Sequence, residues 1–217
     1  MNRRMWTSVT LALSAGLLAA AGLGLMVGVL RLDVVRGAEV HAAQAQTQEV
    51  PKFEVDPAWP KMPNQWVLGQ VASAATDAQD HVWVLHRPRS VRRGQPTGPP
   101  VMEFDAAGNY IQGWGGPGAG YQWPESEHGI FVDYQGYVWI GGQGADDQIL
   151  KFTKDGKFVM QVGRATPKKS NLDTSSLSRP ADVFVYPKTN ELLVADGYGN
   201  RRIIVFDAAT GAFKRMW

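Results

Sequence analysis

The sequence of 217 residues contains no cysteine, which excludes a disulfide framework and any cysteine-ligated metal site. It also lacks a large basic region. Beyond residue 40 the chain carries 18 basic and 18 acidic side chains, and its densest basic run, residues 87–93 (RPRSVRR), is short. Because nucleic-acid binding needs a basic face, we expect no nucleic-acid partner. What is abundant is glycine (24), proline (13) and tryptophan (8), which favours an all-β protein with many tight turns.

The N-terminus differs in character from the rest of the chain. Two arginines in MNRRMW precede 22 residues without charge, from Val9 to Leu30. This pattern predicts that residues 1–40 form an apolar helix that serves either as an export signal or as a membrane anchor. Either alternative places the remaining chain outside the cytoplasm, in the periplasm or the extracellular space, and residues 9–30 would be the tether if one exists. Residues 41–64 are interpreted as a linker followed by a leading strand.

The remaining sequence repeats itself. Residues 76–87 align with residues 132–143, and residues 101–114 align with 149–162 and with 203–216. The anchor phenylalanines Phe104, Phe152 and Phe206 are 48 and 54 residues apart. Internal similarity at this period is typical of propeller blades or of a solenoid.

Each unit contains four short apolar stretches that turn residues separate. In the second unit these are residues 129–132, 137–141, 149–152 and 158–162, and no helical periodicity competes with the strand pattern. DAAG, DYQG and TKDG offer aspartate at the start of a hairpin turn and glycine where φ is positive. We therefore predict three four-stranded propeller blades at about residues 65–116, 123–164 and 177–217, with Trp83, Trp139 and the anchor phenylalanines in the core between blades.

Three blades do not close a ring, because propellers have about four to eight. We expect the chain to be the N-terminal part of a larger ring, and residues 51–69 to provide a strand for the last blade. Association of two half rings is the alternative.

Three segments carry a resemblance to a known family. These are VLHRP (Val84–Pro88), EHGIFVD (Glu127–Asp133) and DGYGNRRIIVF (Asp196–Phe206), in successive units. Residues 179–211 resemble an NHL-type repeat, and residues 65–217 resemble the peptidyl-α-hydroxyglycine α-amidating lyases (peptidylamidoglycolate lyases), which are six-bladed NHL-type propellers. Gly199 and Arg201 stand where that family has cysteine and serine.

The resemblance implies roles for five residues and two cofactors. His128 would be one of three histidine ligands of a catalytic zinc, Arg87 would hold substrate charge, and Tyr198 would be the base. The backbone carbonyls of Ala74 and Ile130 would bind a structural calcium. The substrate, a peptide or small molecule, would lie at the propeller axis. The other histidines here are His41, His81 and His86, so we expect the second and third zinc ligands beyond Trp217.

Each of the proposed catalytic residues also has a structural interpretation. His128 could cap a turn, Arg87 could pair with a nearby carboxylate, and Tyr198 could belong to a plain hairpin. Two rival functions follow: a non-catalytic binding platform at the cell envelope, and a gluconolactonase-like hydrolase with a carboxylate-rich calcium site. Tyr198 departs from the equivalent turns of the first two units, which favours a functional role for it.

Overall fold

The computed structural model describes residues 50–145, 147–164 and 170–217. The predicted apolar helix, signal or anchor (1–40), its tether segment (9–30) and most of the linker lie outside the described residues. Among those described, no helix is long and apolar enough to cross a membrane.

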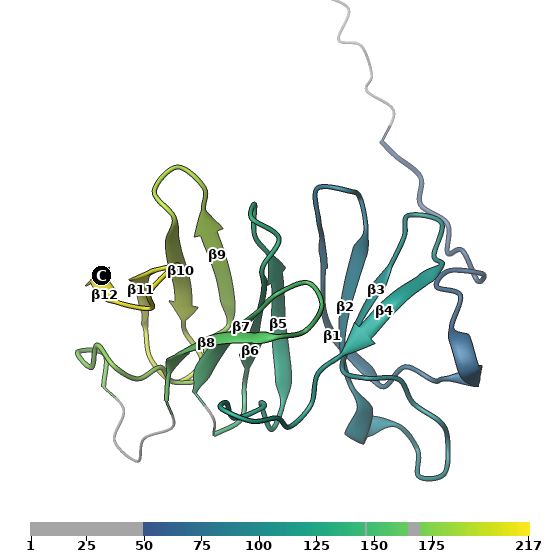
Figure 1. Cartoon of the computed structure of the whole chain (residues 1–217), viewed down its shortest axis with the longest axis horizontal. Coiled ribbons are helices and arrows are strands. Elements are labelled where there is room, and N and C mark those ends of the chain that lie inside the picture. The colour runs from purple at the N-terminus through teal and green to yellow at the C-terminus, as the bar shows by residue number, and fades with distance from the viewer. Residues whose placement is uncertain (1–49, 146, 165–169) are drawn as a thin grey trace, which may run out of the picture. The chain divides into compact units, whose positions relative to one another are not determined.

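The described chain folds into three four-stranded antiparallel sheets, each a meander in sequence order (Figure 1). The first sheet contains β1 (Gln70–Thr76), β2 (Val82–Arg87), β3 (Val101–Phe104) and β4 (Tyr110–Trp114). The second contains β5 (Glu127–Val132), β6 (Val138–Gly142), β7 (Gln148–Phe152) and β8 (Phe158–Gly163). The third contains β9 (Asp182–Tyr186), β10 (Glu191–Asp196), β11 (Arg202–Asp207) and β12 (Phe213–Met216). Two short 3-10 helices, η1 (Pro63–Gln65) and η2 (Pro88–Ser90), complete the described elements. The prediction of an all-β chain with three four-stranded units is confirmed.

The turn chemistry expected from the sequence is present. Gly108, Gly136 and Gly156 have φ angles of 79°, 84° and 80°, where residues with a side chain are strained. The aspartate that opens a turn also stabilises it. Asp133 Oδ1 accepts hydrogen bonds from the backbone N–H groups of Gln135 and Tyr137. These turns fix the register of each meander.

The three sheets pack through two apolar layers. One buries Trp83 and Leu85 of the first sheet with Ile130 and Phe152 of the second, and the other joins the second and third sheets around Trp139. The predicted core residues are all buried: Trp83, Trp139, Phe104, Phe152 and Phe206. The strands β1, β5 and β9 approach one another in turn. Successive sheets that pack face to face, with their first strands adjacent, are the arrangement of propeller blades.

The described residues before β1 form no strand, and the leading strand expected to complete a last blade beyond Trp217 stays a prediction. Between Pro51 and Gly69 the chain has one isolated bridge, Lys61 to Asn109, and the short η1. Trp59 packs on Phe104 with ring centroids 5.9 Å apart, and Trp66 packs on Tyr110. Proline cannot donate to a strand ladder, and four prolines in this segment favour an irregular cover over the first sheet.

Candidate functional site

The predicted catalytic residues come from one end of the three sheets, where β1, β5 and β9 begin. Gln70 opens β1 opposite Arg87, the last residue of β2. Glu127 and His128 open β5, and Asp182 opens β9 opposite Ala195 near the end of β10. Antiparallel register therefore brings residues that are far apart in sequence to the same end of the molecule.

Arg87 connects the first two sheets. Its Nε donates a hydrogen bond to the backbone carbonyl of Glu127 at 2.9 Å, and its Nη1 donates to Gln70 Oε1 at 3.2 Å. Within the described residues its Nη2 makes no hydrogen bond. The guanidinium is thus held in place by two bonds while one edge of its planar fork remains available to an anion.

His128 lies between Arg87 and Tyr198. It is half-buried, and its ring meets that of Tyr198 edge to face with centroids 5.2 Å apart. Burial lowers the pKa of His128 and the positive charge of Arg87 lowers it further, whereas Asp182 acts in the opposite direction. The imidazole is therefore neutral at pH 7, the form that binds metals.

Tyr198 occupies the β10–β11 turn and is 48% exposed. The turn is held by Arg179, whose carbonyl accepts the backbone N–H of Tyr198 and whose Nη2 donates to the carbonyl of Tyr198 at 3.2 Å. The phenol hydroxyl makes no hydrogen bond to any described residue. Gly199 is required by close approach, because a Cβ there would lie 2.7 Å from the Ser178 Cβ and 2.8 Å from its carbonyl oxygen. A side chain at position 199 would therefore overlap Ser178.

Sequence reasoning missed the residue that anchors this hairpin. Arg202 is buried, and its Nε donates to Asp196 Oδ2 at 2.9 Å. Asn200 donates to the same oxygen at 2.8 Å, so its side chain also serves the scaffold of the hairpin. The adjacent Arg201 is exposed. The signal that could have found Arg202 is its cross-strand pairing with Asp196, which places opposite charges face to face.

The two other histidines in the described residues are structural or lie elsewhere. His86 is fully buried; its Nδ1 accepts the backbone N–H of Gly69 at 3.0 Å, and its Nε2 donates to the carbonyl of Pro99 at 2.9 Å. Both ring nitrogens are therefore used by the scaffold. His81 lies in the β1–β2 turn, at the opposite end of the first sheet.

The residues predicted to bind calcium lie inside their strands. Ala74 is exposed in β1 opposite Val84, and Ile130 is buried in β5 opposite Ile140. Both positions follow from the same register that places Arg87 and His128, but no cluster of carboxylates accompanies either in the described residues. Their role as calcium ligands stays a prediction.

A catalytic zinc needs three protein ligands and an open position. His128 belongs to no group of three histidine or carboxylate ligands within the described part of the chain. The described residues therefore supply one imidazole and not a complete zinc site, so we derive no chemical step through a metal.

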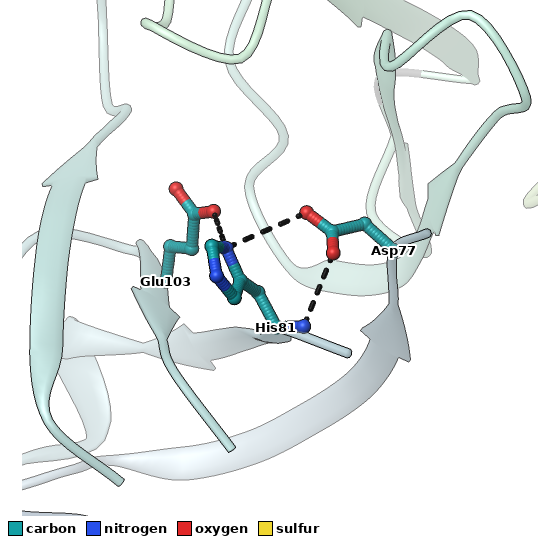
Figure 2. Close-up of side chains that lie close together, drawn as sticks. All are labelled: Asp77, His81 and Glu103. Carbon is teal, nitrogen blue, oxygen red and sulfur yellow. Dashed lines mark hydrogen bonds and ion pairs between the residues drawn. The ribbon is translucent and has the colours of Figure 1, made fainter. Parts of the chain in front are cut away.

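One cluster of three such ligands does exist in the described residues, at the opposite end of the first sheet. Asp77, His81 and Glu103 have ligand atoms within 4.8 Å of one another (Figure 2). His81 Nδ1 lies 2.7 Å from Glu103 Oε1, and Lys154 Nζ of the second sheet lies 2.7 Å from Asp77 Oδ2. Burial raises the pKa of Asp77, but the hydrogen bonds from Lys154, Trp83 and two backbone N–H groups outweigh it and lower the pKa to about 2. The cluster is a network that joins two sheets, in which a lysine ammonium already occupies the place of a cation.

Comparisons with known proteins agree with the resemblance. Peptidylglycine alpha-amidating monooxygenase of Rattus norvegicus is 28% identical over 170 residues, which cover 69% of this chain and 16% of that protein. NHL repeat-containing protein 3 of Mus musculus is 26% identical over 165 residues, covering 72% of this chain and 43% of that protein. The probable peptidyl-alpha-hydroxyglycine alpha-amidating lyase of Caenorhabditis elegans is 35% identical over 82 residues, covering 37% and 22%.

The chain thus spans less than half the length of each of these relatives. No protein-family model matches it. A gluconolactonase from Xanthomonas campestris shares 16% identity and a TM-score of 0.37 over 58% of this chain and 35% of that one, a likeness too low to carry a conclusion. The relatives include amidating enzymes and an NHL-repeat protein, which confirms the predicted resemblance at modest identity.

Proposed function

We propose that the described sheets are part of an NHL-type six-bladed propeller whose axis holds a lyase site for peptides that end in α-hydroxyglycine. The observation that carries this proposal is the convergence of Arg87, His128 and Tyr198. They come from three different sheets, yet the ring of His128 contacts the ring of Tyr198, and the charge of Arg87 lowers the pKa of His128. Arg87 Nη2 and the hydroxyl of Tyr198 form no hydrogen bond to any other described residue.

The reaction requires few groups. The substrate carries an N–CH(OH)–COO⁻ end, and cleavage yields a peptide amide and glyoxylate. A base removes the hydroxyl proton, the C–N bond breaks as the carbonyl forms, and the nitrogen takes up a proton. In this proposal Arg87 binds the carboxylate through its Nη2 edge, because a planar guanidinium suits a carboxylate. Tyr198 is assigned the role of base, which accepts the hydroxyl proton and can return it to the leaving nitrogen.

His128 would be the contribution of this chain to a metal centre. Its neutral imidazole is a competent zinc ligand, and zinc, when bound, would supply a Lewis acid for the developing oxyanion. Two further protein ligands would be needed, and the proposal assigns them to other blades of the ring. Calcium at the carbonyls of Ala74 and Ile130 is proposed on the same resemblance.

The test measures glyoxylate release from an N-acyl-α-hydroxyglycine by protein made from its complete coding sequence, together with its zinc content. We expect Tyr198→Phe and Arg87→Gln each to lower the rate at least about a hundredfold, the range of general-base and charge-stabilising groups. His128→Ala should lower both the rate and the bound zinc.

The matched control is His86→Gln, a buried histidine at the same end of the sheets that this proposal leaves outside the reaction. It should change the rate little. Unchanged glyoxylate release and zinc content in His128→Ala would remove the lyase proposal and leave a non-catalytic binding platform. We also propose, from the charge pattern of residues 1–40, that the protein is exported and works in the periplasm or outside the cell, with residues 9–30 as signal or tether.

A further inference from the structure

A cavity beside Arg87 contains a buried carboxylate that the proposed reaction does not use. The cavity measures about 330 Å³, which is within the range of small-molecule sites. Its walls come from the loop after β2, the approach to β3, the loop after β4 and the approach to β5. We call it the Glu127 pocket; it is lined mainly by Pro88, Arg89, Pro100, Pro117, Trp123 and Glu127.

Glu127 is 2% exposed, and only one of its carboxylate oxygens is satisfied. Oε1 accepts a hydrogen bond from the indole N–H of Trp123 at 2.8 Å. Oε2 has no hydrogen-bond partner among the described residues. A buried carboxylate oxygen without a donor loses its hydration without a hydrogen bond in return, so each such oxygen in a native structure calls for an explanation.

The nearest cation does not complete this carboxylate. Arg89 Nη2 lies 3.9 Å from Oε2, beyond hydrogen-bond distance, and donates to the carbonyl of Pro124 at 3.3 Å instead. The side chain of Arg89 is 63% exposed. It is therefore a weakly held rim residue that an incoming cation can displace.

The pocket has ordered walls and is mostly apolar apart from Glu127 and the two charged rim residues Arg89 and Glu125. Four prolines line it, and the indole of Trp123 is tied down by its bond to Oε1. Such a pocket suits a ligand that has an aliphatic stem and a terminal N–H donor. Little conformational entropy is lost in the protein when the ligand enters, because the walls are already ordered.

We propose that the Glu127 pocket binds an organic cation, a primary ammonium on an aliphatic stem, which donates to Glu127 Oε2 and packs its stem against Trp123 and the prolines. The backbone carbonyl of Glu127 accepts the Nε hydrogen bond of Arg87, so the pocket borders the proposed reaction site. If the proposed function holds, the ligand is a basic side chain of the peptide substrate. That identification rests on the proposed function; the cation site itself does not.

The test titrates the full 217-residue chain with n-butylammonium and follows the indole N–H resonance of Trp123, assigned by its loss in Trp123→Phe. Calorimetry gives the affinity. We expect a saturable shift with n-butylammonium and none with the neutral analogue n-pentanol. Glu127→Gln keeps an acceptor for Trp123 but puts an amide in place of the anionic edge, so the affinity should fall at least about tenfold.

Two neighbouring variants make the result specific. Glu125→Gln removes the same charge from the exposed rim of the pocket and should change the affinity less than about twofold. Arg89→Ala removes the competing cation and should tighten binding at least about twofold, a result that does not depend on whether Glu127→Gln folds. Circular dichroism and thermal melting confirm the fold of each variant.

Equal binding of n-pentanol, retained binding in Glu127→Gln, or equal loss in Glu125→Gln would overturn the proposal. Weaker binding or loss of fold in Arg89→Ala would also overturn it, because Arg89 would then be the native partner of Glu127. Failure of glyoxylate release would leave this binding result standing, so the two proposals fail separately.

Discussion

Replacing Arg202 by alanine should strongly destabilise the third sheet and the loop before it. The side chain of Arg202 is 2% exposed and donates to Asp196 and to the backbone carbonyls of Asn171, Asp173 and Ser176. Alanine removes every one of these donors and leaves a buried carboxylate without its cation. Breaking a buried ion pair in this way costs about 3–5 kcal/mol. Native proteins are stable by about 5–15 kcal/mol, so this is a large fraction of the total.

Urea unfolding, followed by circular dichroism, measures this loss. With a slope of about 2 kcal/mol per molar, the midpoint should fall by about 2 M. Arg201→Ala is the matched control, because its exposed side chain makes no hydrogen bond to the described residues; its effect should stay within about 0.5 kcal/mol. A loss below about 1 kcal/mol in Arg202→Ala, or equal losses in the two variants, would refute the assignment of Arg202 as the anchor.

Two further predictions concern pH and backbone approach. Burial lowers the pKa of both His86 and His128, so the unfolded chain takes up protons first as the pH falls below about 6.5, and the free energy of unfolding should decrease between pH 7 and 5. Thermal melting checks this; His86→Gln should flatten the dependence, and a stability that rises on acidification would contradict it. Gly199→Ala should cost about 1–3 kcal/mol in urea unfolding, because the new Cβ overlaps Ser178. Gly197→Ala, where nothing lies within 4 Å, is its control, and equal losses would show that close approach is not the cause.

The fold was predictable because its signals are local and repeated. Asp133 and Gly136 mark a turn by their own backbone preferences; Asp105 and Gly108 repeat the spacing in the first sheet, and Asp207 and Gly211 lie one residue further apart in the third. Trp83 and Trp139 take equivalent strand positions and both bond through their indole N–H to the aspartate that opens the preceding turn. Four strands joined by three turns in each unit leave little freedom for another topology.

The segment before the first sheet was not predictable in the same way. Its apolar residues have the composition of a strand, but its conformation depends on the surface that it covers. Trp59, Met62 and Trp66 pack against a small core that contains Val84 and Phe104. No periodicity of apolar residues in the sequence indicates this packing. The prediction of a strand there rests on composition, and only pairing with a further blade would test it.

The site was predictable only through resemblance. Arg87, His128 and Tyr198 are 41 and 70 residues apart, and nothing in their spacing indicates that β2, β5 and the β10–β11 turn meet. Whether Arg201 or Arg202 faces the interior depends on the register of the strand, which a shift of a single residue would reverse. Glu127 was missed as a pocket residue because its burial comes from loops of the first sheet.

Hydrogen-bonding capacity separates scaffold from site at this end of the described chain. His86, Asn200 and Arg202 are buried and bonded to neighbours in the chain. Arg87 and Tyr198 are held by equally specific contacts, yet each presents a polar group that bonds to no described residue. Evolution gains no stability from holding a polar group in place without a partner, since the entropy of ordering it is not offset by a bond. A ligand as the missing partner would account for this arrangement, which supports the proposed role of Tyr198, whereas the bonds of Arg202 make it part of the scaffold.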